Sequence, residues 1–189
     1  MTFFRTAALL ACLSFPAAPQ AHGVAQDDGA LLQQFVAPFA IAQLEQHGGF
    51  LPFGAAMRSA GQIVALGGYD GADDEATPPP ADIVRLLQAD LAAGAGNGEY
   101  RATALAYDAS VAIPPDGQPS DAIAIALDLQ DGDSVILYLP YELRDGKVSV
   151  GAPFTRQGTA TIFPVKAVPR ESETASETAS AMTSATASD

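Results

Sequence analysis

Apolar residues recur near a 3.6-residue period in two stretches of the chain, which is typical of amphipathic helices. In the first stretch, residues 28–47, the apolar set is Leu31, Leu32, Phe35, Phe39 and Leu44. Asp27 or Asp28 could cap its start, and the glycine pair at 48–49 marks its end. Pro38 lies inside this stretch and has no backbone N–H to donate. We therefore expect a kink there, or two short helices.

The second stretch predicts a helix over residues 80–93. Its apolar stripe consists of Ile83, Leu87 and Leu91, each four residues after the last. The stretch begins with proline, which suits the first position of a helix, and Gly94 stands where a glycine commonly follows the last turn.

The segments between and after these helices predict strands. Residues 52–58 and 62–66 form a hairpin around a turn at 59–61. From Glu99 to about Gly151 the pattern indicates an antiparallel meander, which ends in a short strand near 147–150.

Alanine and larger residues alternate along two strands of this meander, 100–107 and 121–129. Alanine takes the even positions from 102 to 106 and from 122 to 126, and larger side chains take the odd ones. Because side chains alternate between the faces of a strand, each strand has an alanine side and a larger side. A register that pairs even with even residues would place the two alanine sets together.

The Asp131-Gly132 pair between apolar runs is a strong hairpin signal. A two-residue turn would pair Leu127 with Ile136 and add the odd residues of 135–139 to the alanine side. Both faces of the sheet would then be apolar, so each needs a cover. We predict an α+β fold with a central antiparallel sheet of about five strands and helices on both faces. The alternative is a face closed by a second copy of the chain.

The expected order of elements is helix, two strands, helix and three or more strands. Profilin-like and roadblock-like folds, which are small interaction or ligand-binding modules, share this order. The likeness is an analogy of topology and assigns no function by itself.

The N-terminus has the pattern of an export signal over residues 1–23. Arg5 precedes an apolar run from Ala7 to Ala18, and small residues follow between positions 21 and 25, where we expect cleavage. The run is too short to span a bilayer permanently. These features favour a periplasmic or secreted protein. In a competing interpretation, Cys12 would become the lipid-anchored N-terminus of a lipoprotein.

Beyond the signal, we expect one globular domain over residues 26–168 and a disordered tail over 169–189. The tail consists mainly of Ser, Thr, Ala and Glu and has almost nothing to bury. The chain carries 22 acidic and 9 basic residues, a formal net charge of −13. This charge repels phosphate backbones and anionic headgroups, and therefore argues against nucleic-acid or membrane-surface binding. Cys12 is the only cysteine, so a mature chain would form no disulfide.

Several short segments together resemble a group of uncharacterised bacterial proteins. The shared features are a Pro-Phe-x-Ala-Ala strand, a Tyr-Asp-Gly loop and a Leu-Pro-Tyr strand end, at Pro52–Ala56, Tyr69–Gly71 and Leu139–Tyr141. The resemblance covers most of residues 28–164 and gains its specificity from the order of the segments. The turn at 59–61 departs from the group, in which an acid tends to lie next to glycine. The resemblance implies a single domain and transfers no activity or site.

The densest acidic cluster follows the second predicted strand and contains Asp70, Asp73, Asp74 and Glu75. Calcium takes six or more oxygen ligands, and such loops often supply them. The spacing lacks the pattern of an EF-hand, and prolines follow at once. A solvated acidic loop is the preferred interpretation, and a weak divalent-metal site is the alternative.

Tyrosines are the remaining candidates for contact with a partner. Tyr107 and Tyr138 should share the larger side of the sheet and serve the core. Tyr69 lies beside a loop and Tyr141 at a strand end, so we expect both to be exposed. Together with Asp70, they form the predicted partner-binding set.

Catalytic motifs are weak throughout. There is no G-x-S-x-G, and His47 at a helix end suits the helix dipole better than a triad. Asp108 and Asp121 fall at strand ends, where aspartate commonly flanks a turn. They are nevertheless the carboxylates on which a hydrolase would depend.

The sequence therefore predicts an exported, acidic, non-enzymatic module that binds a protein or a small ligand and needs no cofactor. A carboxylate-dependent hydrolase and a homodimeric structural module are the alternatives. Carboxylates that converge in a deep cleft would favour the enzyme, whereas an apolar patch would favour binding.

Overall fold

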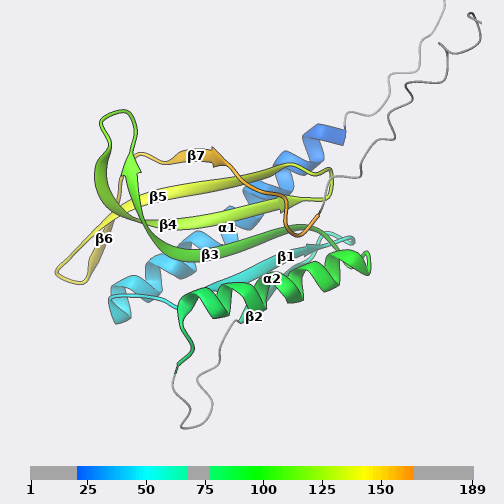
Figure 1. The fold of residues 1–189 in the computed structure, drawn as a ribbon, viewed down its shortest axis with the longest axis horizontal. Coiled ribbons are helices and arrows are strands. Elements are labelled where there is room, and N and C mark those ends of the chain that lie inside the picture. Colours follow the sequence, from blue (N-terminus) through cyan, green and yellow to red (C-terminus); the bar gives the residue numbers. More distant parts are fainter. Residues whose placement is uncertain (1–20, 68–76, 164–189) are drawn as a thin grey trace, which may run out of the picture.

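The computed structural model describes residues 21–67 and 77–163, which form two helices and seven strands (Figure 1). In chain order the elements are α1 (Ala21–His47), β1 (Phe53–Arg58), β2 (Ile63–Gly67), α2 (Pro80–Gly96), β3 (Tyr100–Ile113), β4 (Gln118–Leu129), β5 (Ser134–Arg144), β6 (Lys147–Val150) and β7 (Phe154–Gln157). The α+β class and the predicted hairpin are confirmed. Neither helix in this part of the chain is long and apolar enough to cross a membrane.

All strand pairs of the sheet are antiparallel, in the order β2-β1-β3-β4-β5-β6, with β7 paired to β5. The sheet has seven strands where the sequence predicts about five. Two short strands share one edge of β5: β6 pairs with residues 141–144 and β7 with residues 135–138. β7 escaped prediction because its sequence, Phe-Thr-Arg-Gln, contains a single apolar residue.

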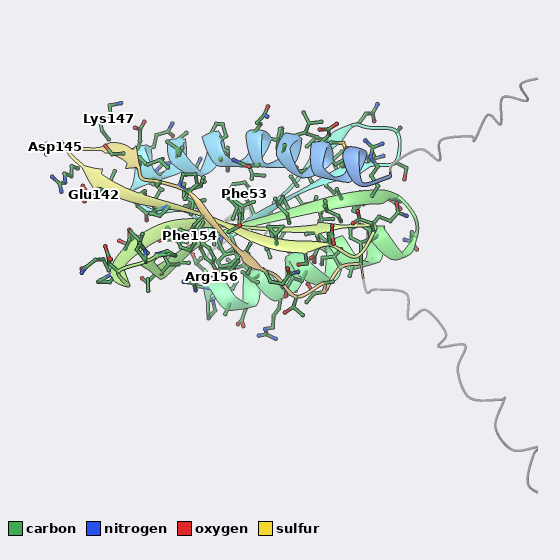
Figure 2. All side chains as sticks on the ribbon, turned by 90° about the horizontal axis from the view of Figure 1, so that it is seen from above. Phe53, Glu142, Asp145, Lys147, Phe154 and Arg156 are labelled. Carbon is green, nitrogen blue, oxygen red and sulfur yellow. The ribbon has the colours of Figure 1, made fainter. Side chains whose placement is uncertain are left out.

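The two helices pack against opposite sides of β3. The buried residues of α1, which include Val36 and Ala40, contact Ala104 and its even-numbered neighbours. Ile83 and Leu87 of α2 contact Leu105. Since successive residues of a strand point to opposite faces, α1 and α2 lie on either side of the sheet (Figure 2).

The cover of the α2 face is not a helix alone. α2 covers β1 and β3, where Leu91 packs with Ala56, and two residues from beyond β7, Ile162 and Phe163, join this cluster. On the same face, Phe154 of β7 lies beside Tyr138 of β5 and stacks against its ring. The last described residues thus add to the apolar contacts that α2 makes on this face.

The register between β4 and β5 differs by one residue from the prediction. Leu127 pairs with Val135, not with Ile136, and Gly132 adopts a φ of 93°. The Gly132 N–H donates to the Leu129 carbonyl at 2.9 Å, and the Leu129 N–H donates to Asp133 at 2.9 Å. These bonds define a three-residue loop with a glycine bulge in place of a two-residue turn.

This shift moves a whole set of side chains to the other face of the sheet. The odd residues of 135–139 join the larger side of β4, and Ile136 and Tyr138 join its alanine side. Across β3 and β4 the pairing is even with odd, so Ala104 lies opposite Leu127. Small and large residues therefore interleave on both faces, and the expected meeting of the two alanine sets is wrong.

The first helix is longer than predicted and passes through Pro38 as one helix, not two short ones. Val36 and Ala40, on either side of the proline, are both fully buried, so packing against the sheet holds the two halves together. Asp28 lies within the helix and is not its cap. Its carboxylate accepts hydrogen bonds from Nε and Nη2 of Arg101, each at 2.7 Å. This ion pair ties α1 to the start of β3 and, with the hydrogen bond as the main cause, raises the pKa of Arg101.

Gly94 does not end the second helix, which continues to Gly96 and is capped by Asn97. Gly94 is instead buried against the ring of Tyr100, where any side chain would overlap the aromatic carbons. The residue with positive φ beyond the helix is Gly98, at 74°. Close packing, not helix termination, therefore explains the glycine at position 94.

Candidate functional site

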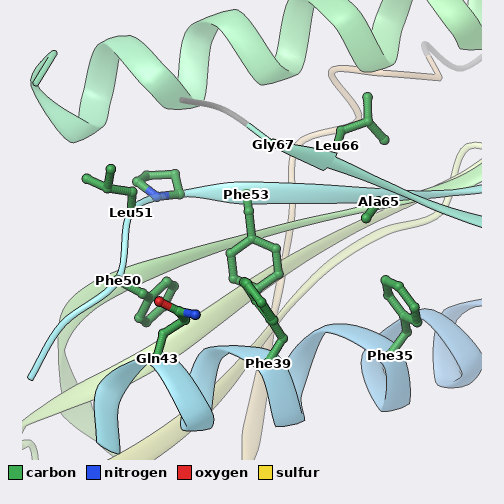
Figure 3. Close-up of a pocket in the computed structure, with 10 residues that line it drawn as sticks. Phe35, Phe39, Gln43, Phe50, Leu51, Phe53, Ala65, Leu66 and Gly67 are labelled. Carbon is green, nitrogen blue, oxygen red and sulfur yellow. The ribbon is translucent and has the colours of Figure 1, made fainter. Parts of the chain in front are cut away.

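A cavity of about 500 Å³ lies between α1 and the β1–β2 end of the sheet (Figure 3). Its lining residues are Phe35, Phe39, Gln43, Phe50, Leu51, Pro52, Phe53, Ala65, Leu66 and Gly67. This volume is within the range of sites that hold small ligands or a few side chains.

The helical wall of the cavity exists because α1 carries two apolar stripes. One stripe, Leu32, Val36, Ala40 and Leu44, is fully buried against the sheet. The other stripe is Leu31, Phe35 and Phe39, which are 47%, 45% and 51% exposed. The two stripes are about 100° apart around the helix, so only one can face the centre of the sheet. The exposed stripe lies toward the β2 edge of the sheet, where Phe35 and Phe39 line the cavity together with β2 residues.

Three aromatic rings form the inner end of the cavity. The Phe39 and Phe53 rings meet edge to face, with centroids 4.8 Å apart and planes at 78°. The Phe50 ring meets Phe53 in a similar arrangement at 5.9 Å. Edge-to-face pairs are favourable beyond the area they bury, so these contacts hold the wall in place.

Small residues on β2 leave the space that the aromatic residues enclose. Ala65 and Gly67 lie on the same face of the sheet as Phe53, which pairs directly with Gly67. A side chain at Gly67 would meet no atom of the described residues within 4 Å. Larger residues at these two positions would fill the cavity.

The chemistry of the cavity is apolar. Gln43 is the only lining residue with a polar side chain, and no lining residue is ionisable. No protein-family model, curated protein or solved structure matches this chain. The cavity offers one amide for orientation and no group for acid–base or nucleophilic chemistry, which suits binding.

A second, polar recess lies further along the α1 face, where Asp108 and Asp121 occur on β3 and β4. The Tyr141 hydroxyl donates to an Asp108 carboxylate oxygen at 3.1 Å, and Asp121 pairs with Tyr141 across the strands. Partial burial raises the pKa of Asp108, and the charge of Asp121 adds to this effect, while the bond from Tyr141 opposes it. Burial and the nearby carboxylate of Asp108 raise the pKa of Tyr141.

The structure thus brings the two predicted hydrolase carboxylates to one face of neighbouring strands. Asp121 accepts a hydrogen bond from the Ser110 hydroxyl at 3.4 Å. The recess beside it holds about 450 Å³ and is lined by Asp121 and Tyr141 together with Gly48, Pro119, Ser120, Glu142, Leu143 and Arg144. Asp108 and Asp121 are exposed to solvent, so the carboxylates lie at the surface rather than in a deep cleft.

The tyrosine predictions have mixed outcomes. Tyr141 is only 9% exposed, so the expected exposure is wrong: its ring joins the core and its hydroxyl is held by Asp108. Tyr138 is buried as predicted, and it shares a cluster with Tyr107. Tyr69 lies outside the described residues, and its contact with a partner stays a prediction.

The predicted acidic metal cluster, Asp70, Asp73, Asp74 and Glu75, also lies outside the described residues. Within residues 21–67 and 77–163, no three His, Cys, Asp or Glu side chains gather as a metal site would require. The structure therefore does not test the predicted metal site in this loop.

The cavity escapes prediction when the apolar residues of the first helix are counted as one stripe. The signal was present: Leu31, Phe35 and Phe39 keep a spacing of four, and Leu32, Val36 and Ala40 keep the same spacing one position on. Two such stripes are more than one sheet face can cover. The contribution of Phe53 and Ala65 depends on the sheet order and has no local signal.

Proposed function

We propose that this protein is an exported, non-enzymatic module that binds an apolar ligand or apolar side chains in the cavity between α1 and β1–β2. The observation that carries this proposal is an aromatic cavity with no ionisable lining residue. Half-exposed phenylalanines lower the solubility of a protein. A partner that binds in the cavity would cover them.

Two properties of the whole chain support this function. The N-terminal pattern suits export, and the expected cleavage between residues 21 and 25 falls in the first turns of α1, ahead of the exposed stripe. The net charge of −13 keeps a protein with an apolar patch soluble.

A carboxylate-dependent hydrolase at Asp108 and Asp121 is the second candidate. A raised carboxyl pKa beside a second carboxylate is an arrangement that general acids use. Turnover of a glycoside or ester by the wild type, abolished in both Asp108→Asn and Asp121→Asn, would support this candidate against the first.

The binding function is tested with N-phenyl-1-naphthylamine, a neutral apolar dye that fluoresces in apolar surroundings. We expect saturable binding to the wild type, weakened roughly tenfold in Phe39→Ala because the variant removes much of one wall. Leu86→Ala is the matched control, since Leu86 is 58% exposed on α2 and does not line the cavity. Equal dye affinity in all three proteins would refute the proposed site.

A further inference from the structure

We propose that the cavity receives an extended peptide segment of another protein, which pairs as an added strand with the outer edge of β2. The inference rests on the proposed function, because it takes the cavity as the binding site, and it names the class of partner.

The outer edge of β2 is open within the described part of the chain. β2 is the last strand in the sheet order, and β1 is its one partner there (Figure 1). An open edge displays a row of backbone donors and acceptors that another strand can pair with. The opposite edge of the sheet is formed by β6 and β7, two strands of four residues each, which pair with β5.

The turn before β2 fixes which backbone groups face outward. The Arg58 N–H donates to the Gln62 carbonyl at 2.8 Å, and the register pairs Ala56 with Val64 and Gly54 with Leu66. Hydrogen-bonded pairs alternate along an antiparallel ladder, so the even residues of β2 bond to β1. The N–H and C=O groups of the odd residues, 63, 65 and 67, point outward and have no partner strand among the residues that the structure describes.

The outward-pointing backbone groups and the cavity belong to the same residues. Ala65 and Gly67 line the cavity with their side-chain face, while their backbone groups point to the open edge. Phe35 and Phe39 extend from α1 toward this end of the sheet (Figure 3). A strand added alongside β2, at the usual spacing of about 4.8 Å, would lie next to the exposed stripe of α1.

The dimensions indicate how much of a peptide the site would hold. The exposed stripe from Leu31 to Phe39 spans about 12 Å at 1.5 Å per helical residue. Side chains on one face of a strand repeat about every 7 Å. Two alternate side chains of the peptide would therefore enter the cavity, and the residues between them would face away from α1.

Charge favours a peptide of another protein over a second copy of this chain. Each copy carries a net charge of −13, so two copies repel one another at the distances of strand pairing. The same negative charge would attract a peptide in which apolar residues alternate and Lys or Arg residues flank them. The geometry therefore fits strand addition by a basic partner, in which the main chain gives affinity and the cavity gives specificity.

The test uses the full chain and a short probe peptide in which Val and Leu alternate with Thr between terminal lysines. Amide hydrogen exchange followed by NMR should show at least roughly tenfold slower exchange at Ile63, Ala65 and Gly67 when the peptide is added. Val64 and Leu66, whose N–H groups already bond to β1, should change little. This alternation is specific to strand pairing and would not arise from a bound dye.

Two controls separate backbone pairing from apolar contact. A peptide N-methylated at alternate residues keeps its side chains. It is prepared in both phases, because only one phase places the methyl groups where peptide N–H groups would bond to β2. We expect roughly tenfold weaker binding from that phase than from the unmethylated peptide. Ala65→Pro removes one outward N–H and none that bonds to β1, which an edge strand tolerates. This variant should bind the peptide more weakly than Ala65→Val, which adds similar bulk at the same cavity position but keeps the N–H.

The outcomes distinguish the two proposals. Dye binding without peptide protection, or equal binding of the methylated and unmethylated peptides, would refute strand addition and leave the apolar site in place. Protection of Ile63, Ala65 and Gly67 that rises with protein concentration in the absence of peptide would show a second copy on the edge and overturn the proposal. Loss of dye binding in Phe39→Ala, together with loss of peptide protection, would support both.

Discussion

At the scale of single residues, two side-chain environments carry testable consequences. Gly94 is buried in α2 against Tyr100, and Asp108 on β3 holds the hydroxyl of Tyr141. Neither environment follows from the residue type, because glycine in a helix and aspartate on a strand are both locally unfavourable. In each case the contact across the fold determines the effect of the residue.

Gly94→Ala should destabilise the domain by about 1–3 kcal/mol, because the new methyl group overlaps the Tyr100 ring and forces repacking. Gly96→Ala is the matched control in the same helix, where a methyl group meets no atom within 4 Å. It should leave the unfolding free energy unchanged or raise it by up to about 1 kcal/mol. Urea denaturation measures both. An unchanged midpoint for Gly94→Ala would show that the helix and β3 are not in close contact.

Asp108→Asn should change the pH dependence of stability. Because partial burial raises the pKa of Asp108 in the folded state, the folded protein loses stability as pH rises from the ordinary aspartate value through the raised one. The asparagine variant keeps an acceptor for Tyr141 and lacks this loss. Its thermal midpoint should therefore exceed that of the wild type at pH 7 more than at pH 3. The gain should stay within about 0.5 kcal/mol because the carboxyl is exposed. A larger rise of the thermal midpoint at pH 3 than at pH 7 would contradict a raised pKa of Asp108 in the folded state.

At the scale of elements, a single carboxylate holds the last described residues onto the sheet. Asp128 of β4, only 6% exposed, accepts hydrogen bonds at Oδ2 from the N–H groups of Thr161 and Ile162, at 3.3 and 3.1 Å. The Thr161 hydroxyl donates to the same oxygen. Ile162 and Phe163 thereby complete the cover that α2 begins.

Asp128→Ala should cost about 1–3 kcal/mol, since it leaves the buried Ile162 N–H without its acceptor. Amide exchange at Ile162 should accelerate more than exchange in β3. Asp128→Asn retains an oxygen acceptor and should lose less, and Asp90→Ala on the exposed side of α2 should have almost no effect. If exchange at Ile162 does not change in Asp128→Ala, this carboxylate does not anchor the segment.

Elements with a local signal were predictable from the sequence, and their pairing was not. Hydrophobic periodicity and glycine turns gave α2 and the β1–β2 hairpin within a few residues of their bounds. The β4–β5 register was wrong because Asp131-Gly132 serves both a two-residue turn and a three-residue loop with a bulge, which differ by one residue. β7 had no signal because its pairing with β5, not its composition, makes it a strand.

At the scale of the whole molecule, the two-sided apolar sheet explains where the cavity lies. α1 covers the centre of one face, and α2 with the last described residues covers the other. Three of the six large apolar side chains that are exposed among the described residues, Leu31, Phe35 and Phe39, form the second stripe of α1, beside the edge strand β2. The sequence predicted the covered faces but not this exposed stripe, because its position depends on the order of the strands.

An NMR titration of the full chain with N-phenyl-1-naphthylamine tests the apolar binding site directly. We expect saturable shift changes concentrated at the cavity, including Phe35, Phe39 and Phe53, with the amides of Asp108 and Asp121 unaffected. Shift changes concentrated at Asp108 and Asp121, or the absence of any saturable change at the three phenylalanines, would contradict a binding site in the cavity.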